Sequence, residues 1–474
     1  MRGSADARLL PFPSVTFSDV AIGEDDNGQP LMTVARFSMD AELAPFLRGE
    51  ILIFDMRLER PSVTLRILPD GQLDWALRHR PATPGETVVL EKVSITEADI
   101  RIVDEQNDRS HYVQSVDAVA SAKSLSGPWI VEGRARILGR TGAFTVSTGA
   151  VEESGKVRLR TRVRPDDQPV EVETEGDARI VDGKPRYDGA FVMRVFAADE
   201  AVPDGAPPKT RAIARGAFEA DNERLRIAEY RLEMGAGTDP YVVTGEATID
   251  TGPNPEFLLT ADGQQVDVNR LGSEEANGKT SRRPASLPER LAQLTAFLAE
   301  LPPPPLPGRI DVALPAIVAG DTTIRDIRFA ARPADQSWQI DHLAASLPGR
   351  TRVEADGLLQ VGETTAFSGN LLVASNQPSG LANWLSGEVD PVIRRIADAG
   401  FSAKVSLTPR IQRFEGLELA IGPAILKGSL ERQTPEGQTP SLSLALKGDR
   451  FDVDAVRALS ALAGVGRSDG ADWL

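Results

Sequence analysis

Two neighbouring segments of the chain carry opposite charges at the spacing of a β-strand. Arginine occupies every second position of residues 157–164, and glutamate every second position of residues 170–175. Side chains alternate between the two faces of a strand, so each segment has one charged and one apolar face. An antiparallel hairpin aligns four pairs: Arg164 with Glu171, Arg162 with Glu173, Arg160 with Glu175 and Arg158 with Asp177. A slip by one residue would set arginine against valine, so the pattern predicts one register.

The other face of this hairpin is apolar. A wide amphipathic sheet either packs on a second layer or binds an apolar ligand. We predict that the charged face is the solvated exterior, where its ion pairs serve solubility and register. The apolar face is carried by Val157, Leu159, Val163, Val170 and Val172, and the alternation leaves open which of these two roles it has.

Strand-like alternation recurs along most of the 474 residues. Consecutive strands favour an antiparallel meander over alternating helices and strands. A faint repeat of strand, turn and glycine-containing strand covers residues 230–245, 340–357 and 417–428. We therefore predict a mainly β protein: an elongated, twisted antiparallel sheet of stacked hairpin repeats that forms an amphipathic groove. A few short helices, at residues 41–48, 378–385 and 391–399, are expected to cap sheet edges.

The predicted domains are separated by a segment of different composition. Residues 273–283 are polar, residues 287–301 carry a leucine stripe at helical spacing, and residues 302–307 are rich in proline. We predict an N-terminal β-groove domain at residues 1–272, a linker with an amphipathic helix at 273–308, and a second β-repeat domain at 309–474. We expect the second domain to continue beyond the given C-terminus.

Charge and composition exclude several classes of protein. The net charge of −16 disfavours a nucleic-acid partner, because phosphate backbones require clustered basic residues. The absence of cysteine excludes disulfides, thiolate metal sites and cysteine nucleophiles. No apolar run reaches the roughly 18 to 20 residues of a membrane span, and the first residues lack the apolar core of a signal peptide.

The candidate catalytic motifs are weak, so we predict no enzyme, cofactor or metal site. The glycine-rich segment 272–280 has the wrong spacing for a phosphate-binding loop and contains two glutamates. Residues 24–28 lack the ligand spacing of a calcium loop. A hydrolase would need two carboxylates, or a serine and a histidine, to converge in a cleft. The remaining candidates are expected at surfaces, strand ends and turns: His79, His111, His342, Glu97, Asp99, Asp104 and Glu105.

The N-terminal quarter contains several short motifs that together resemble one family. They are LLPFPSVTF at 9–17, VAIG at 20–23, LAPFLRGEI at 43–51, LERP at 58–61 and PDGQLDW at 69–75. Weaker matches are IRIVD at 100–104, LSGP at 125–128 and GQQVDVN at 263–269. These segments resemble the AsmA family of bacterial envelope proteins.

The resemblance implies a protein tethered to the inner membrane by one N-terminal helix, with a folded sheet in the periplasm whose apolar concave face accommodates lipid. The lipid groove is then expected to be lined by Val157, Leu159, Val163, Val170 and Val172. The resemblance further implies partners among phospholipids or other acyl lipids, a part in outer-membrane assembly, and contacts with other envelope proteins. The given chain begins without such an anchor, so we expect either a start just after the helix or a soluble form. The alternative is a structural or interaction scaffold of the periplasm whose apolar face is covered by its own second layer.

Overall fold

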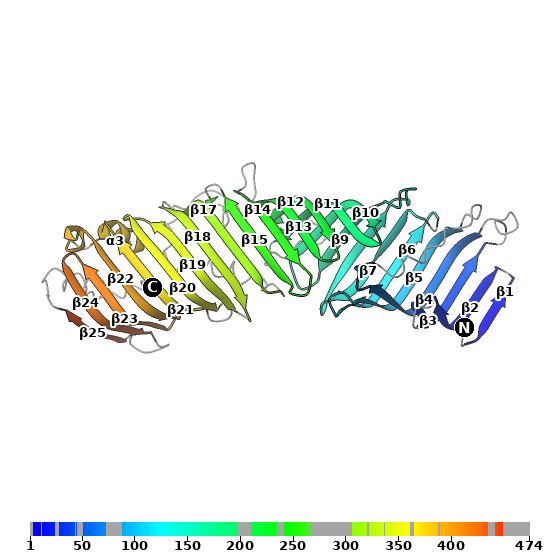
Figure 1. Ribbon diagram of the computed structural model, residues 1–474, viewed down its shortest axis with the longest axis horizontal. Helices are drawn as coiled ribbons and strands as arrows, with labels where there is room; N and C mark the ends of the chain where they lie inside the picture. Colours follow the sequence, from blue (N-terminus) through cyan, green and yellow to red (C-terminus); the bar gives the residue numbers. More distant parts are fainter. Residues whose placement is uncertain are drawn as a thin grey trace, which may run out of the picture. The chain divides into compact units, whose positions relative to one another are not determined.

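The computed structural model is built almost entirely of β-strands in chain order (Figure 1). It describes residues 3–448 except 11, 24–27, 43, 45–50, 73–87, 125, 197–209, 235–240, 264–265, 268–305, 320–321, 336, 361–364, 387–388, 390 and 435–440. The chain divides into two compact units. The first contains Met1–Leu232 and Thr248–Pro255, and the second contains Glu233–Ala247 and Glu256–Leu474. The prediction of a mainly β fold is confirmed.

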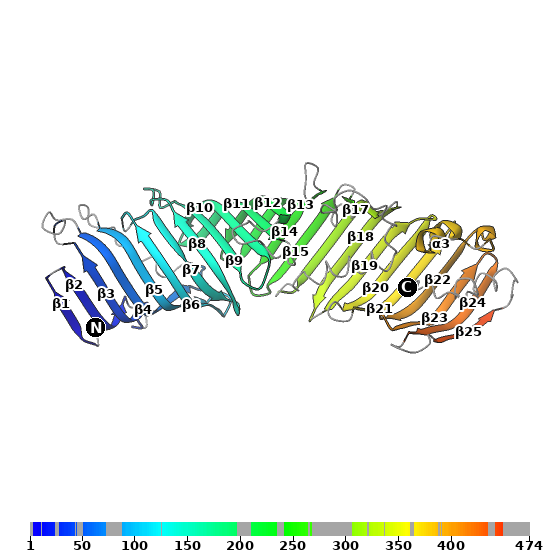
Figure 2. The ribbon, with the colours of Figure 1, turned by 180° about the vertical axis from the view of Figure 1, so that it is seen from behind.

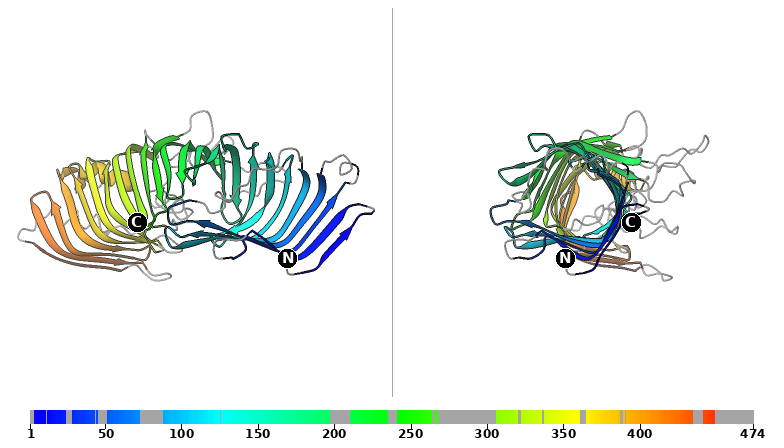
Figure 3. Two further views of the ribbon diagram at one scale, coloured as in Figure 1. Left: turned by 45° about the vertical axis from the view of Figure 1, so that its right-hand side comes forward. Right: turned by 90° about the vertical axis from the view of Figure 1, so that its right-hand side faces the viewer.

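The first unit is one curved layer of strands (Figure 3). Its strands up to the unit boundary are β1 (Ala5–Arg8), β2 (Ser14–Ile22), β3 (Met32–Ala41), β4 (Ile51–Ile67), β5 (Val88–Asp104), β6 (Arg109–Ala122), β7 (Trp129–Ile137), β8 (Arg140–Thr148), β9 (Val157–Pro165), β10 (Val170–Val181), β11 (Lys184–Phe196), β12 (Thr210–Asp221) and β13 (Arg224–Met234). The next strand, β14 (Tyr241–Asp250), contributes residues to both units.

The second unit is built in the same way. Its strands are β15 (Glu256–Gly263), β16 (Val266–Asp267), β17 (Gly308–Ala319), β18 (Thr322–Ala334), β19 (Ser337–Leu347), β20 (Thr351–Gln360), β21 (Ala366–Ser375), β22 (Ala399–Leu407), β23 (Ile411–Ile421), β24 (Ala424–Gln433) and β25 (Ser441–Gly448). Between β21 and β22 lie helix α3 (Pro378–Ser386) and the short 3-10 helix η3 (Ile393–Arg395). Figure 2 shows α3 at the ends of the strands.

Most neighbouring strands pair antiparallel, as predicted, but two parallel junctions were not predicted. β4 pairs parallel with β5, and β17 pairs parallel with β15 and β16. Parallel neighbours require a long crossover connection, whereas antiparallel neighbours can be joined by a tight turn. Long connections do precede β5 and β17, at residues 68–87 and 268–307. Two of the predicted repeat hairpins are confirmed as β19–β20 and β23–β24.

The predicted register of the charged hairpin is confirmed for three of its four pairs. β9 and β10 align Arg162 with Glu173, Arg160 with Glu175 and Arg158 with Asp177. The aligned part of this ladder ends one pair earlier, at Val163 and Val172, so the pairing of Arg164 with Glu171 stays a prediction. Toward the other neighbouring strand, Glu171 lies opposite Arg194 of β11 and accepts its hydrogen bond at 3.1 Å. The Arg164 guanidinium lies 5.5 Å from the centre of the Phe196 ring.

The predicted helices had different outcomes. The helix at 378–385 is confirmed as α3. The prediction of a helix at 391–399 was wrong. This segment contains the 3-10 helix η3, and Ala399 begins β22. Pairing of β22 with β21 and β23 outweighs the local helix propensity of the segment. Ala41 ends β3, and most of 41–48 lies outside the described residues. The predicted linker, with its helix, also lies outside the described residues up to residue 305. The domain boundary at residue 272 therefore stays a prediction.

Glycines opposite aromatic rings mark close approaches between strands of the first unit. Phe191 lies opposite Gly216, and Phe218 lies opposite Gly189. A Cβ added to Gly216 would lie 2.8 Å from Cε1 of Phe191, and one added to Gly189 would lie 2.2 Å from the Glu175 carbonyl oxygen. Larger residues therefore do not fit at these positions without displacing a strand. Glycine kinks covered by aromatic rings are a known means of bending a sheet.

Candidate functional site

The first unit carries two adjacent rows of mostly apolar side chains that cross its sheet on one face. Directly paired residues of neighbouring strands share a face, so the register defines each row. One row is Val15, Met39, Met56, Val93, Ala120, Val131, Val146, Thr161, Thr174 and Phe191. The other is Phe17, Phe37, Leu58, Ile95, Ala118, Gly133, Phe144, Val163, Val172, Met193 and Ala214. We call this surface the inner face and the opposite one the outer face.

All five residues predicted from the sequence lie on the inner face. Val163 and Val172 are directly paired, and Val157, Leu159 and Val170 follow at even spacing along the same two strands. Val163 is 37% exposed, and the other four are half-buried. No strand or helix among the described residues forms a second layer over them.

The inner face is more buried around β5 and β6. On β6, Ala118 and Ala120 are 6% and 4% exposed, whereas Val119 between them is 49% exposed on the outer face. These alanines belong to two neighbouring clusters that include Val93, Val116 and Val131. Because adjacent residues differ so strongly in exposure, the inner face is the concave side of the curved sheet here.

The second unit has an inner face of the same kind. Its longest row is Ile310, Ala331, Ile340, Gly357, Gly369, Val405, Phe414, Leu430 and Leu444. Val405 and Leu417 anchor an apolar cluster on this face, packed against Phe401, Phe414 and Leu446. Sequence reasoning named no lining residue in this unit, although the alternation of β22 to β24 carries the same signal.

A group of hydroxyls interrupts the inner face of β9 to β11. The Thr161 and Thr174 hydroxyl oxygens are 2.6 Å apart, and that of Thr174 lies 2.7 Å from the Tyr187 hydroxyl. The Tyr187 hydroxyl also donates to the Leu159 carbonyl oxygen at 3.3 Å. Burial raises the pKa of Tyr187, which keeps it a neutral donor. The Tyr187 ring packs edge-on against Phe218, with centroids 4.8 Å apart.

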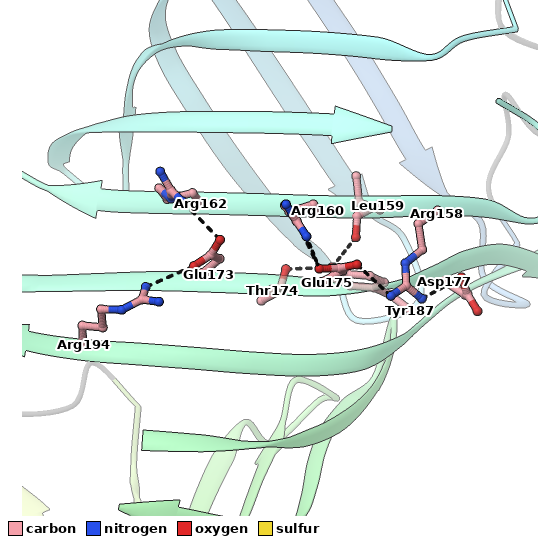
Figure 4. A network of polar contacts seen from close by, with 10 residues as sticks. All are labelled: Arg158, Leu159, Arg160, Arg162, Glu173, Thr174, Glu175, Asp177, Tyr187 and Arg194. Carbon is pink, nitrogen blue, oxygen red and sulfur yellow. Dashed lines mark hydrogen bonds and ion pairs between the residues drawn. The ribbon is translucent and has the colours of Figure 1, made fainter. Parts of the chain in front are cut away.

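The outer face of the same strands carries the charged ladder (Figure 4). Arg158 Nη2 lies 2.9 Å from a Glu175 oxygen, and Arg160 also pairs with Glu175. Glu173 bridges two strands, because it accepts from Arg194 at 3.1 Å and from Arg162 at 3.2 Å. The bond from Arg194 holds the pKa of Glu173 below its ordinary value, and bonds from Arg158 and Arg160 do the same for the pKa of Glu175.

This ladder predicts a pH-dependent contribution to stability. Since the pKa of Glu173 is lower when folded than when unfolded, its ion pairs stabilise the fold fully above about pH 4.3, the ordinary glutamate value. The contribution is lost as the pH falls through the lowered value. Glu173→Gln should therefore lower the urea midpoint of unfolding at pH 7, and this difference from wild type should vanish in strong acid. Glu132→Gln, an exposed outer-face position, is the control, and a Glu173→Gln deficit that persists unchanged in acid would contradict the assignment.

The predicted catalytic candidates do not converge. His111 and His342 are exposed on β6 and β19, whereas His79, the glycine-rich segment 272–280 and most of 24–28 lie outside the described residues. Glu97 is exposed on β5, and the other three candidate carboxylates accept local hydrogen bonds. Asp99 accepts from the Ser115 amide, Asp104 from the amides of Gln106 and Asn107, and Glu105 from Arg66. Within the described ranges, no group of three or more acidic or histidine side chains could hold a metal ion.

A shallow hollow of about 510 Å³ lies in the second unit. Charged residues of β19 to β23 contribute much of its lining, among them Asp341, Glu354, Asp356, Lys404 and Glu418. Glu354 and Glu418 belong to the outer face, since they alternate with Ala355 and Leu417 of the inner face. The lining also includes Ala403 and Leu371 of the apolar cluster, so the hollow combines charged and apolar residues.

The fold and the site together define a class of protein: a β-sheet protein whose units each present a continuous apolar inner face. Comparison with known proteins adds no nearer identity, because no family model, curated protein or solved structure matches the chain. Within the described ranges, no helix has the length and apolar character needed to cross a membrane.

Proposed function

We propose that this chain is a noncatalytic protein of the bacterial envelope that binds or conducts acyl lipid along its inner face and supports outer-membrane assembly. The observation that carries the proposal is the continuity of the apolar rows, from β2 to β12 in the first unit and from β17 to β25 in the second. In the periplasm, an anchor in the inner membrane and contacts with other envelope proteins would complete this role.

The chemistry of the rows suits alkyl chains. They consist mainly of valine, leucine, isoleucine, methionine, alanine and phenylalanine, and Val163 and Leu444 within them are 37% and 45% exposed. An acyl chain of about sixteen carbons in water exposes surface worth about 0.8 kcal/mol per methylene, or roughly 13 kcal/mol. A continuous apolar surface removes most of that cost at every step along the sheet. Lipid can then move from row to row without entering water.

Lipid extraction and transfer assays test the proposal. We expect phospholipid to co-purify with the full chain and to be identified by mass spectrometry. We also expect the protein to accelerate transfer of a fluorescent phospholipid from donor to acceptor vesicles. Purified protein that carries no lipid and leaves the transfer rate unchanged would overturn the proposal.

A second candidate is a structural scaffold of the periplasm with no lipid path. The burial of Ala118 and Ala120 favours it, because side chains that already pack on one another offer little surface to a ligand. The two candidates differ at Val163, whose exposure suits a ligand surface and serves no purpose in a closed core. A scaffold would bind partner proteins equally well when Val163 is made polar.

A further inference from the structure

The strand ends along one border of the first unit's sheet meet the strand ends along its opposite border. We call these two borders, each formed by turns and strand ends, the edges of the sheet. The strands from β5 to β12 pair antiparallel throughout, so β5 and β12 run in opposite directions. The turn between β5 and β6 therefore lies at one edge, and the turn between β12 and β13 lies at the other. Seven strand spacings separate β5 from β12, which is about 34 Å across a flat sheet at about 4.8 Å each. The two turns nevertheless bond to each other. The sheet must therefore curl strongly between them.

Side chains of the two edges form direct hydrogen bonds. The Asn222 side-chain amide donates to Gln106 Oε1 at 3.0 Å, and the Gln106 amide donates to the Glu223 carboxylate. Arg109, at the start of β6, donates to the carbonyl oxygens of Thr251 and Pro253 at 3.3 and 2.7 Å. Thr251 and Pro253 follow β14 and belong to the first unit. We call these six residues the seam.

Each edge of the seam is held in shape by a local aspartate. Asp104 is 4% exposed and accepts from the amides of Gln106 and Asn107 at 3.1 and 3.2 Å. Asp221 accepts from the amides of Glu223 and Arg224 at 2.9 and 2.8 Å. Such bonds fix turns and orient the side chains at their tips. The bonding groups of both edges are thus positioned before the edges meet.

A second pair of turns from the same two edges lies in close contact beside the seam. A Cβ added to Gly71, after β4, would lie 3.1 Å from Nζ of Lys184 at the start of β11. A Cβ added to Gly183 would lie 2.6 Å from Cγ of Gln72. The same two edges therefore touch at a second place, between the β4 end and the β10–β11 turn.

We propose that the seam is a lateral gate for acyl lipid on the inner face of the first unit. The inner face is the concave side at β6, so edges that meet enclose it from the side. Lipid bound behind the closed seam can leave sideways there only after the two edges part. The seam suits this task because its bonds join polar groups that water can replace, while the paired strands on either side stay intact. The inference rests on the proposed function and adds its regulation.

Cross-linking the two edges tests the gate in the full chain. The chain contains no cysteine, so Gln106→Cys with Asn222→Cys introduces the only thiols. A short, cleavable bismaleimide should join them and slow release of a fluorescent phospholipid to acceptor vesicles at least about tenfold, as expected for a locked gate. Cleaving the linker should restore the rate. Arg109→Ala, which removes two bonds of the seam without a cross-link, should speed release.

The matched control joins two strands that are already paired. Glu132→Cys with Thr145→Cys places the same linker between β7 and β8 on the outer face, where release should stay at the uncross-linked rate. An unchanged rate in the locked seam variant would overturn the gate, and so would failure of two reactive thiols at the seam to cross-link. If the uncross-linked protein and every variant take up no phospholipid, the proposed function fails and the gate fails with it.

Discussion

Val163→Asp should reduce the phospholipid that co-purifies with the protein, and the rate of vesicle-to-vesicle transfer, by at least about tenfold. Val163 lies in an apolar row between Phe144 and Val172. A carboxylate there must lose water whenever an acyl chain covers it, and burying an unpaired charge costs several kcal/mol. Each 1.4 kcal/mol lost is about a tenfold loss of affinity. Because Val163 is 37% exposed, the variant should still fold.

The control is the same substitution on the other side of the sheet. Val119 is 49% exposed on the outer face of β6, so Val119→Asp adds the same charge with similar access to solvent. Lipid content and transfer should stay at the wild-type level in this variant. Equal losses from both substitutions would indicate an effect of charge alone and would remove Val163 from the binding surface. Circular dichroism should show the same strand content for both proteins.

Leu426→Ala should destabilise the second unit by about 2 to 5 kcal/mol, the usual range for a large-to-small change in a core. Leu426 is 1% exposed on β24, and its side chain fills the space beside Gly448, where an added Cβ would lie 2.4 Å from Cδ2 of Leu426. Hydrogen exchange should show the loss as weaker protection of β23 to β25. The strands of the first unit should keep their protection, since β24 pairs with β23 and β25, which both belong to the second unit.

Ile425→Ala provides the comparison one residue away. Ile425 points to the opposite face and is 60% exposed, so its truncation should change stability by about 0.5 kcal/mol or less. Similar losses of protection in the two variants would contradict the assignment of a buried inner face and an exposed outer face at β24.

The sequence predicted those features that depend on neighbouring residues. The matched charges of Arg158 to Arg162 and Glu173 to Asp177 specify a register because any slip breaks every pair at once. The face of the five predicted valine and leucine positions follows from the same alternation. The predicted pair of Arg164 with Glu171 lies beyond the aligned part of the ladder, and Glu171 also accepts a hydrogen bond from Arg194 of β11, which the hairpin pattern did not predict.

Features that join distant residues were not predictable in this way. The parallel pairing of β4 with β5 depends on a crossover whose length alone does not specify direction. The strand at Ala399 formed where a helix was predicted, because β21 and β23 supply partners that a local pattern does not contain. The inner-face clusters around Ala118 were likewise missed, since alanine alternation is a weak signal until curvature buries it.

By itself, the sequence determined the type of structure, the spacing of its strands and the face on which each charge of the ladder lies. These depend on the two-residue period of a strand, which is a local property. Only the tertiary structure decided how far the sheet curls. This curl brings Gln106 and Arg109 into hydrogen-bond contact with turns about seven strands away. Curl accumulates from small twists at every strand and from glycine contacts such as Gly189 with Phe218. The total depends on all pairs together, and no single segment encodes it.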